Sequence, residues 1–386
     1  MDEIMDKIKE ESIKTEIPEG KLKKNDRIFY NPKMKLNRDI SALALNIFSK
    51  MAKRKITACD ALSSSGIRAL RIAKECRNIE KVIINDMNPT AVKTAETTAK
   101  NNNIKNAEFS TEDANIFLSK NKNRFDYIDI DPFGSPVYYL DSCARAASGK
   151  SLMGITATDT APLSGTYPKT CIRRYGSVPL REDIKHEVAI RILIASIVRA
   201  FSRHDKSFVP IISYSKIHYL RVLGISTSNT GLAGKSAQAI GYVLYCKKCG
   251  NRRFSKKPEN IRCDICSSEF STAGPLWTGP INSTLFLEKM IRNNNIKSAE
   301  LTSLLETLHD ESRILNLFYD THSVCKKNHL KIPKLADLFK TLKDKGCKAE
   351  RTHFELTGFR TDADYKELLK IIADNGVKYV SSTTKK

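Results

Sequence analysis

The chain has 386 residues, and 41% of them are hydrophobic. This length allows two or three domains, and this apolar fraction excludes a wholly disordered chain. The chain carries 65 lysines and arginines against 43 aspartates and glutamates, a formal net charge of +22, which favours a polyanionic partner.

The basic residues are clustered, and this favours a nucleic-acid partner over a solvated lysine coat that keeps the protein soluble. One cluster lies near the N-terminus, a second surrounds paired cysteines and a third lies towards the C-terminus. In chain order the clusters consist of Lys21, Lys23, Lys24 and Arg27; Lys247, Lys248, Arg252, Arg253, Lys256 and Lys257; and Lys340, Lys343, Lys345, Lys348 and Arg351.

The sequence gives no sign of export or membrane insertion. Residues 1–6 are acidic and no apolar signal region follows them. The most apolar expected helix, 188–198, contains Arg191 and is too short to cross a bilayer. Of ten cysteines, six are scattered singly and four are paired, which favours a reducing compartment. We therefore expect a cytoplasmic protein with no membrane attachment, no obligate protein partner and a monomeric state.

The first 50 residues or so are polar and basic, and a regular alternation of strands and helices follows them. This alternation implies βαβ units and a mainly parallel sheet. Pro89 suits the first position of its helix. The expected strands are 56–59, 81–85, 108–110, 125–130 and 151–156, and the expected helices are 66–76, 89–102, 115–119 and 137–147.

An irregular stretch with several prolines and glycines follows residue 156. A long helix is expected over 183–201 and another strand over 208–214. From residue 241 the chain becomes a short cysteine module. Beyond Pro280 it is lysine-rich and helical, with helices expected over 298–309 and 335–345.

The tetrapeptide Asp131-Pro132-Phe133-Gly134 directly follows the apolar strand 125–130. Ligands of open α/β sheets bind at the carboxyl ends of the strands. A carboxylate next to an aromatic ring suits a planar nitrogen heterocycle, because the ring stacks on the base and the carboxylate accepts a hydrogen bond from its exocyclic amine. Pro132 has no N–H and a fixed φ, so it holds the neighbouring carbonyl groups outward. The tetrapeptide therefore indicates chemistry at an amino group conjugated to a ring.

The loop 60–68, with the sequence Asp-Ala-Leu-Ser-Ser-Ser-Gly-Ile-Arg, joins the first strand to its helix. Alone it does not distinguish a ligand-binding loop from an ordinary tight turn. Asp86 follows the second strand 20 residues after Gly66, a spacing that suits a carboxylate on the ribose hydroxyls of an adenosine-containing cofactor. Asp113, beside Ala114, ends the third strand and is placed to face the adenine amine. Three polar strand ends in succession favour a cofactor cleft.

A second glycine-rich sequence, 231–236, is similar to the end of a phosphate-binding loop. The motif requires a glycine at position 229, which is Asn229. We therefore reject a phosphate loop there.

Four cysteines form two C-x-x-C pairs separated by 13 residues. This spacing predicts a tetrathiolate structural zinc site in a ribbon-like hairpin. Free cysteines or a redox pair are the alternatives. The predicted ligands are Cys246, Cys249, Cys263 and Cys266. The other cysteines, Cys59, Cys76, Cys143, Cys171, Cys325 and Cys347, are expected to be small buried hydrophobic residues.

Taken together, these motifs resemble the tRNA (guanine(26)-N2)-dimethyltransferase family of class I S-adenosylmethionine-dependent methyltransferases. The resemblance covers nearly the whole chain. It rests on 20–37 (with Phe29-Tyr30-Asn31-Pro32), Asn37-Arg38-Asp39, 60–68, Asp86, Asp113, 131–134, the four paired cysteines, 158–163 and 171–176.

The resemblance implies that methyl groups are transferred, once or twice, from S-adenosyl-L-methionine to N2 of guanine 26 in tRNA. It implies that Asp131 and Phe133 act at the base, with Phe29 as the second face of a stack. The serine-rich first loop departs from the family's glycine-rich version, and this shifts the expected contact with the methionine carboxylate onto the two arginines of the cofactor set. The implied cofactor residues are Arg38, Arg68, Asp86, Asp113 and Ala114.

The expected fold is a Rossmann-like class I methyltransferase domain with a basic N-terminal segment over 1–240, a zinc module over 241–275 and a mixed, helix-rich, basic tRNA-binding domain over 276–386. Two rival functions remain open at this point. One is an amino methyltransferase acting on adenine N6 or on ribosomal RNA, and the other is a zinc-ribbon RNA-binding protein without enzymatic activity.

Overall fold

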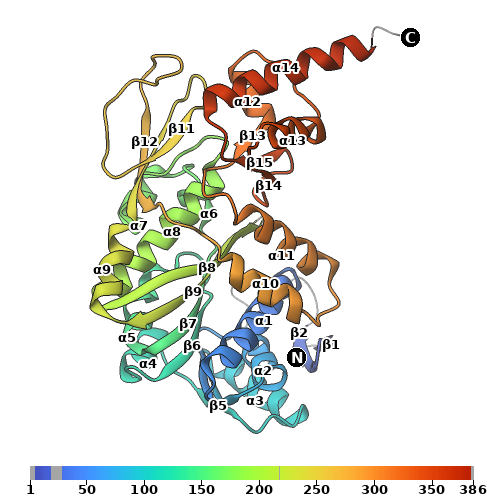
Figure 1. Ribbon diagram of the computed structural model, residues 1–386. Coiled ribbons are helices and arrows are strands. Elements are labelled where there is room, and N and C mark those ends of the chain that lie inside the picture. Colours follow the sequence, from blue (N-terminus) through green and yellow to red (C-terminus); the bar gives the residue numbers. More distant parts are fainter. Residues whose placement is uncertain (1–4, 19–27, 217, 384–386) are drawn as a thin grey trace.

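The computed structural model describes residues 5–18, 28–216 and 218–383, and a seven-stranded sheet forms its centre (Figure 1). The strand order is β5-β4-β3-β6-β7-β9-β8. Neighbouring strands from β5 to β7 are parallel, whereas β9 is antiparallel to both β7 and β8. The strands are β3 Ile56–Asp60, β4 Ile79–Asn85, β5 Ala107–Ser110, β6 Phe125–Ile130, β7 Ala147–Ala157, β8 Lys206–Lys216 and β9 Tyr219–Ser228.

Six of these strands lie where the sequence predicts them, with ends shifted by a few residues, and β9 was missed. Arg221 and Gly224 interrupt its apolar pattern, and such residues argue against a buried strand when burial is unknown. In the structure Arg221 is fully buried because a carboxylate pairs with it.

Two helical layers cover the sheet, one on each face. On one face lie α1 Lys35–Ala52, α2 Ile67–Glu75 and α3 Pro89–Asn101. On the other lie α4 Ala114–Lys120, α5 Leu140–Ala146 and α8 Lys185–Ser202. The short elements are η1 Pro32–Met34, η2 Pro136–Tyr139, α6 Thr160–Leu163, α7 Pro168–Tyr175 and α9 Thr230–Gln238.

The glycine-rich sequence that resembles a phosphate loop lies inside α9. Its rejection is therefore confirmed, because residues within a helix interior do not form a phosphate-cradling loop.

The helix α1 and the N-terminal hairpin were not predicted. Asn31 caps η1 by accepting a hydrogen bond from the Lys33 amide, Pro32 stands at the first position, and α1 follows directly. The hairpin of β1 Met5–Glu10 and β2 Ile13–Pro18 is held to the helices by Glu10. Its carboxylate pairs with Arg38 of α1 and Arg71 of α2. The basic cluster predicted over 21–27 lies outside the described residues.

The cysteine module is a three-stranded antiparallel sheet in the order β11-β10-β12. The C-terminal part forms a second small sheet, in the order β13-β15-β14, with helices around it. The bounds are β10 Ile240–Tyr245, β11 Arg252–Ser255, β12 Ser271–Trp277, β13 Tyr319–Asp320, β14 Ala349–Arg351, β15 Gly358–Thr361, α12 Thr321–Lys327, α13 Leu335–Asp344 and α14 Tyr365–Thr383.

The described residues after 276 pack in two places. Helices α10 Thr284–Asn293 and α11 Ala299–Glu311 pack against α1 and share its hydrophobic core (Figure 1). The residues from Tyr319 to Ile372 instead share a core with the cysteine module. The predicted domain boundary at 276 therefore places α10 and α11 in a different domain from α1, the helix that they cover. The three-domain division stays a prediction.

Among the described residues, no helix combines the length and the hydrophobicity that are needed to span a bilayer.

A buried ion pair joins strands β6 and β9 through the space that a glycine leaves in β7. Nη2 of Arg221 lies 2.5 Å from Oδ2 of Asp129, and both side chains are fully buried. Gly154 is the register partner of Asp129. A Cβ at Gly154 would lie 2.3 Å from Nη2 of Arg221 and 2.8 Å from Oδ2 of Asp129.

Gly154→Ala is therefore expected to push this pair apart and to destabilise the protein by about 3 kcal/mol, because the separated charges stay buried. Urea unfolding measures the loss. Gly149→Ala is the control in the same strand, since nothing lies within 4 Å of its added Cβ. It should change stability by less than about 0.5 kcal/mol, and equal losses in the two variants would contradict the explanation.

Candidate active site

The carboxyl ends of the parallel strands carry polar residues along one edge of the sheet. Asp60 ends β3, Asp86 follows β4, Asp131 follows β6, and Thr158 follows β7. Because β3 and β6 are neighbours, Asp60 stands beside Asp129 in register. This edge is the position at which open α/β sheets bind ligands.

Asp131 is held through one oxygen only. Its Oδ2 accepts a hydrogen bond from Nη2 of Arg68. Nη1 of Arg68 donates in turn to Asn37 Oδ1 at 2.6 Å and to Ser41 Oγ at 3.1 Å. The Asp131 side chain stays 15% exposed, and no described residue donates to its second oxygen, Oδ1. The carboxylate is thus fixed in direction and presents a free acceptor.

A second layer of charge lies beneath Arg68. Its Nε is 3.4 Å from Oδ1 of Asp129 and 3.8 Å from Oδ2 of Asp60. Burial and the neighbouring Asp129 raise the pKa of Asp60 to about 7, and its buried Oδ1 has no hydrogen-bond partner among the described residues. Burial alone would raise the pKa of Asp129 as well, but Arg221 and Arg68 hold it below its ordinary value. Asp129 therefore stays ionised and anchors both arginines.

The loop that carries the tetrapeptide is tied to the end of β7. The Gly134 amide donates to Thr158 Oγ1 at 2.6 Å, and the Thr158 amide donates to the Gly134 carbonyl at 3.0 Å. Gly134 has φ +98°, a conformation that favours glycine. The next residue, Ser135, donates to the Tyr175 hydroxyl, which donates to Asp159 at 2.5 Å. These bonds fix the loop on which Asp131 and Phe133 stand.

Phe29 and Phe133 lie together, but not as a slot for a base. Their ring centroids are 4.7 Å apart and the ring planes meet at 80°. A base between two parallel rings needs roughly twice the ~3.5 Å contact distance of carbon atoms. The two rings therefore form no open slot in this structure, and one ring must turn and move before a base can enter between them. The stack of a base on Phe29 and Phe133 stays a prediction. The Phe29 backbone is held by Ser64, whose Oγ accepts from the Phe29 amide and donates to its carbonyl.

Asp86 follows β4 as the sequence predicts, whereas Asp113 lies three residues beyond the end of β5, at the N-cap of α4. Both carboxylates keep some acceptor capacity. The two oxygens of Asp86 accept from the amides of Ser64 and Asn88 at 2.7 and 2.9 Å. Oδ1 of Asp113 caps α4 through the amides of Asn115 and Ile116. No described residue donates to its Oδ2. Ala114, the first residue of α4, is buried.

Arg38 is committed to the N-terminal hairpin. Its Nε and Nη2 donate to Glu10 at 2.7 and 2.5 Å, and its guanidinium also donates to the Asn31 carbonyl. Burial alone would raise the pKa of Glu10, yet Arg38 and Arg71 lower it to about 2. Both arginines of the predicted cofactor set are thus bound to carboxylates of this chain, and their contact with a cofactor stays a prediction.

The four paired cysteines converge as metal ligands do. Their sulfur atoms all lie within 4.8 Å of one another. The two closest pairs are Cys246 with Cys266 at 3.4 Å and Cys249 with Cys263 at 3.6 Å. Of the other six cysteines, five are buried as expected, and Cys347 is partly exposed.

Sequence reasoning missed the residues that support Asp131 from below. Asn37 and Ser41 lie on the unpredicted helix α1, and Arg221 lies on the unpredicted strand β9. One signal was available in Asp129, which lies in the middle of the apolar run Tyr127–Ile130, because a buried carboxylate requires a buried cation.

Comparison with known proteins agrees with the geometry. The family model described as N2,N2-dimethylguanosine tRNA methyltransferase matches residues 6–373. The tRNA (guanine(26)-N(2))-dimethyltransferase of Methanosphaera stadtmanae is 39% identical over 95% of this chain and 96% of its own length. The tRNA (guanine(26)-N(2)/guanine(27)-N(2))-dimethyltransferase of Aquifex aeolicus is 36% identical over 89% of each chain.

A solved structure is similar over the same extent. Trm1 from Pyrococcus horikoshii, in complex with S-adenosyl-L-methionine, matches with a TM-score of 0.85 and 31% identity, covering 95% of this chain and 99% of that one. The fold is thus a Rossmann-like class I methyltransferase domain with appended cysteine and C-terminal modules. The chain belongs to the N2,N2-dimethylguanosine tRNA methyltransferase family.

Proposed function

We propose that the chain methylates N2 of guanine 26 in tRNA, once or twice, and that Asp131 is the group that receives the N2 proton. The family and the relatives at 36–39% identity support the reaction and the substrate. The observation that carries the role of Asp131 is its single free oxygen at a strand end, with the other oxygen held by Arg68.

The polar strand ends fit S-adenosyl-L-methionine. Asp86 would accept hydrogen bonds from the ribose hydroxyls, and the free oxygen of Asp113 would accept one from the adenine amine. Arg68 and Arg38 would offer positive charge to the methionine carboxylate. When bound, the cofactor would supply an electrophilic methyl group on a sulfonium, and N2 would form its bond to that carbon as the carbon–sulfur bond breaks.

Asp131 makes the exocyclic amine a better nucleophile. The N2 lone pair is delocalised into the guanine ring, so an unassisted amine is weak. Oδ1 of Asp131 would accept an N2–H hydrogen bond and then the proton as the new bond forms, a general-base contribution of about 10²–10⁴ in rate. Arg68 keeps the carboxylate pointed at the base by holding Oδ2.

The aromatic pair orients the base once it opens. Phe133 is 48% exposed, so it lies within reach of an entering base. Stacking on Phe133 and Phe29 would contribute about 1–3 kcal/mol per base. This offsets the few kcal/mol needed to extrude the guanine from its own stack.

Asp131→Asn is expected to lower kcat by at least about 100-fold, because the amide keeps the shape but accepts no proton. Affinity for tRNA should stay within a few-fold of wild type. Methyl incorporation from labelled cofactor into an unmodified tRNA transcript, followed by nucleoside analysis, measures the loss. Asp344→Asn is the control, since Asp344 is exposed at the end of α13. If Asp131→Asn keeps most of its activity, Asp131 is not the base.

The cysteine cluster fits a structural zinc ion. With zinc–sulfur bonds of about 2.3 Å, a tetrahedral site has sulfur–sulfur edges of about 3.8 Å. The observed separations of 3.4 and 3.6 Å are close to that value. Because Cys246, Cys249 and Cys263 belong to the core shared with the C-terminal helices, the ion would stabilise both modules.

Wild-type protein is expected to contain one zinc ion per chain by elemental analysis. Cys263→Ser should lose it and lower the unfolding temperature, since structural zinc contributes directly to folding. The matched control is Cys347→Ser, because Cys347 lies outside the cluster and should keep its zinc. Wild-type protein without zinc, or Cys263→Ser with a full complement, would refute the assignment.

The basic C-terminal residues are proposed to bind the tRNA backbone, as the net charge of +22 favours. A truncated protein that tests this tRNA contact should keep α10 and α11, because these two helices cover α1. The monomeric state and the cytoplasmic location stay predictions.

A further inference from the structure

A hollow of about 310 Å³ lies between α5, α7 and α8 on the catalytic domain. Four arginines line it, together with the backbone turn that ends α7. The four are Arg173, Arg174, Arg199 and Arg203, and this hollow is called the arginine pocket below.

The positive charge of the arginine pocket is only half balanced. Arg174 pairs with Asp159 at 3.0 Å, and Arg203 pairs with Asp141 at 2.8 Å. Arg199 is half-buried, and among the described residues its guanidinium donates only to neutral oxygens, the Tyr175 carbonyl and Ser196 Oγ. Burial and the nearby Arg203 lower the pKa of Arg199. Arg173 is exposed, and no described residue pairs with it. Two guanidinium groups therefore lack a counter-ion within the part of the chain that the structure describes.

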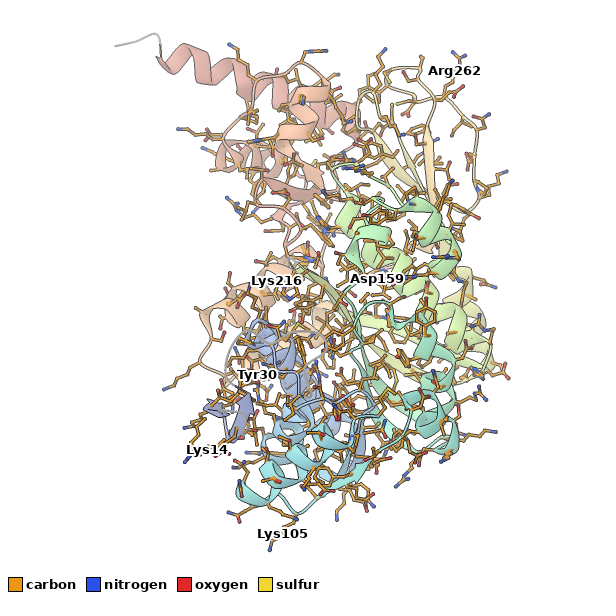
Figure 2. All side chains as sticks on the ribbon, turned by 180° about the vertical axis from the view of Figure 1, so that it is seen from behind. Lys14, Tyr30, Lys105, Asp159, Lys216 and Arg262 are labelled. Carbon is orange, nitrogen blue, oxygen red and sulfur yellow. The ribbon has the colours of Figure 1, made fainter. Side chains whose placement is uncertain are left out.

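The arginine pocket is connected to the active site by an unbroken hydrogen-bonded path. Arg174 holds Asp159, and Asp159 accepts from the Tyr175 hydroxyl. That hydroxyl accepts from Ser135, the residue directly after the 131–134 loop. Figure 2 shows Asp159 near the middle of the molecule, between Lys105 at one end and Arg262 at the other. One wall of the pocket is thus linked, through Asp159, Tyr175 and Ser135, to the loop that carries the proposed base.

The surroundings of the arginine pocket suit a nucleic-acid strand. Tyr138, one residue from Val137 in the pocket wall, is 62% exposed, and Tyr167 at the start of α7 is 59% exposed. Exposed aromatic rings near arginines are the elements from which single-stranded nucleic acid sites are built. A second basic hollow of about 580 Å³ shares Arg203 with the arginine pocket and is also lined by the exposed Lys122 and Arg145.

We propose that the arginine pocket binds a backbone phosphate of the tRNA strand that enters the active site, next to the target guanine. Arginine forks bind phosphate oxygens in pairs, and the two unpaired guanidinium groups supply the missing positive charge. This inference rests on the proposed function and adds an RNA contact on the catalytic domain to the one proposed for the C-terminal residues. A free phosphate or nucleotide offers the same chemistry, so the test separates these sources.

The test compares Arg173→Glu with Lys105→Glu in the full-length protein. Both variants change the net charge equally, and Lys105 is exposed at the far end of the catalytic domain (Figure 2). Equilibrium binding of unmodified tRNA is measured at several salt concentrations. Arg173→Glu should weaken binding at least about 10-fold and reduce the slope of log K against log salt by about 1, as expected for one lost phosphate contact. Arg173→Lys should recover most of the affinity.

Two further measurements keep the outcomes distinct. Binding of S-adenosyl-L-methionine should be unchanged in Arg173→Glu, which excludes misfolding, and kcat at saturating tRNA should fall much less than the affinity. Inorganic phosphate at millimolar concentration should not fully displace tRNA from the wild-type protein. Equal affinities of Arg173→Glu and Lys105→Glu for tRNA would overturn the inference, as would full competition by inorganic phosphate. Failure of the wild-type protein to methylate guanine would instead refute the proposed function.

Discussion

The active site depends on one ion pair, in which Arg68 of α2 holds one oxygen of Asp131 and leaves the other free. Arg68 in turn needs buried negative charge beneath it, and Asp129 supplies that charge while also binding Arg221. Two arginines thus face three carboxylates. The raised pKa of Asp60 shows where the excess negative charge is relieved, since a partly protonated Asp60 weakens the repulsion among the three.

This buried cluster explains features of the fold that have no direct part in the chemistry. Gly154 has no side chain because the Arg221–Asp129 pair occupies that space. Helix α1 lies against the sheet and brings Asn37 and Ser41 to Nη1 of Arg68, which donates to both. The N-terminal hairpin then locks α1 and α2 together through Glu10. The position of the free Asp131 oxygen is therefore set by segments from three regions of the chain.

The sequence predicted the alternating sheet, the tetrapeptide at the end of β6 and the four converging cysteines, because each depends on local pattern or fixed spacing. It did not predict β9 or α1, since their buried polar residues, Arg221 and Asn37, look unfavourable until their partners are known. The orientation of Phe29 and Phe133 was equally out of reach. Two aromatic residues can be placed in one site from motifs, but the angle between their rings depends on long-range hydrogen bonds that hold each backbone, with Ser64 at Phe29 and with Thr158 at Gly134.

The proposed tRNA contacts lie on two surfaces, the C-terminal residues and the arginine pocket, and the proposed contact of Asp131 is with N2 of the target guanine, beside the methyl group that N2 attacks. The most direct test of the Asp131 contact is a binding cycle with wild-type and Asp131→Ala protein and transcripts carrying guanosine or inosine at position 26. Inosine lacks N2. The account predicts that inosine weakens wild-type binding at least about 5-fold more than it weakens Asp131→Ala binding, as expected for a lost charged hydrogen bond. Equal losses in both proteins would show that Asp131 does not touch N2 and would contradict the account.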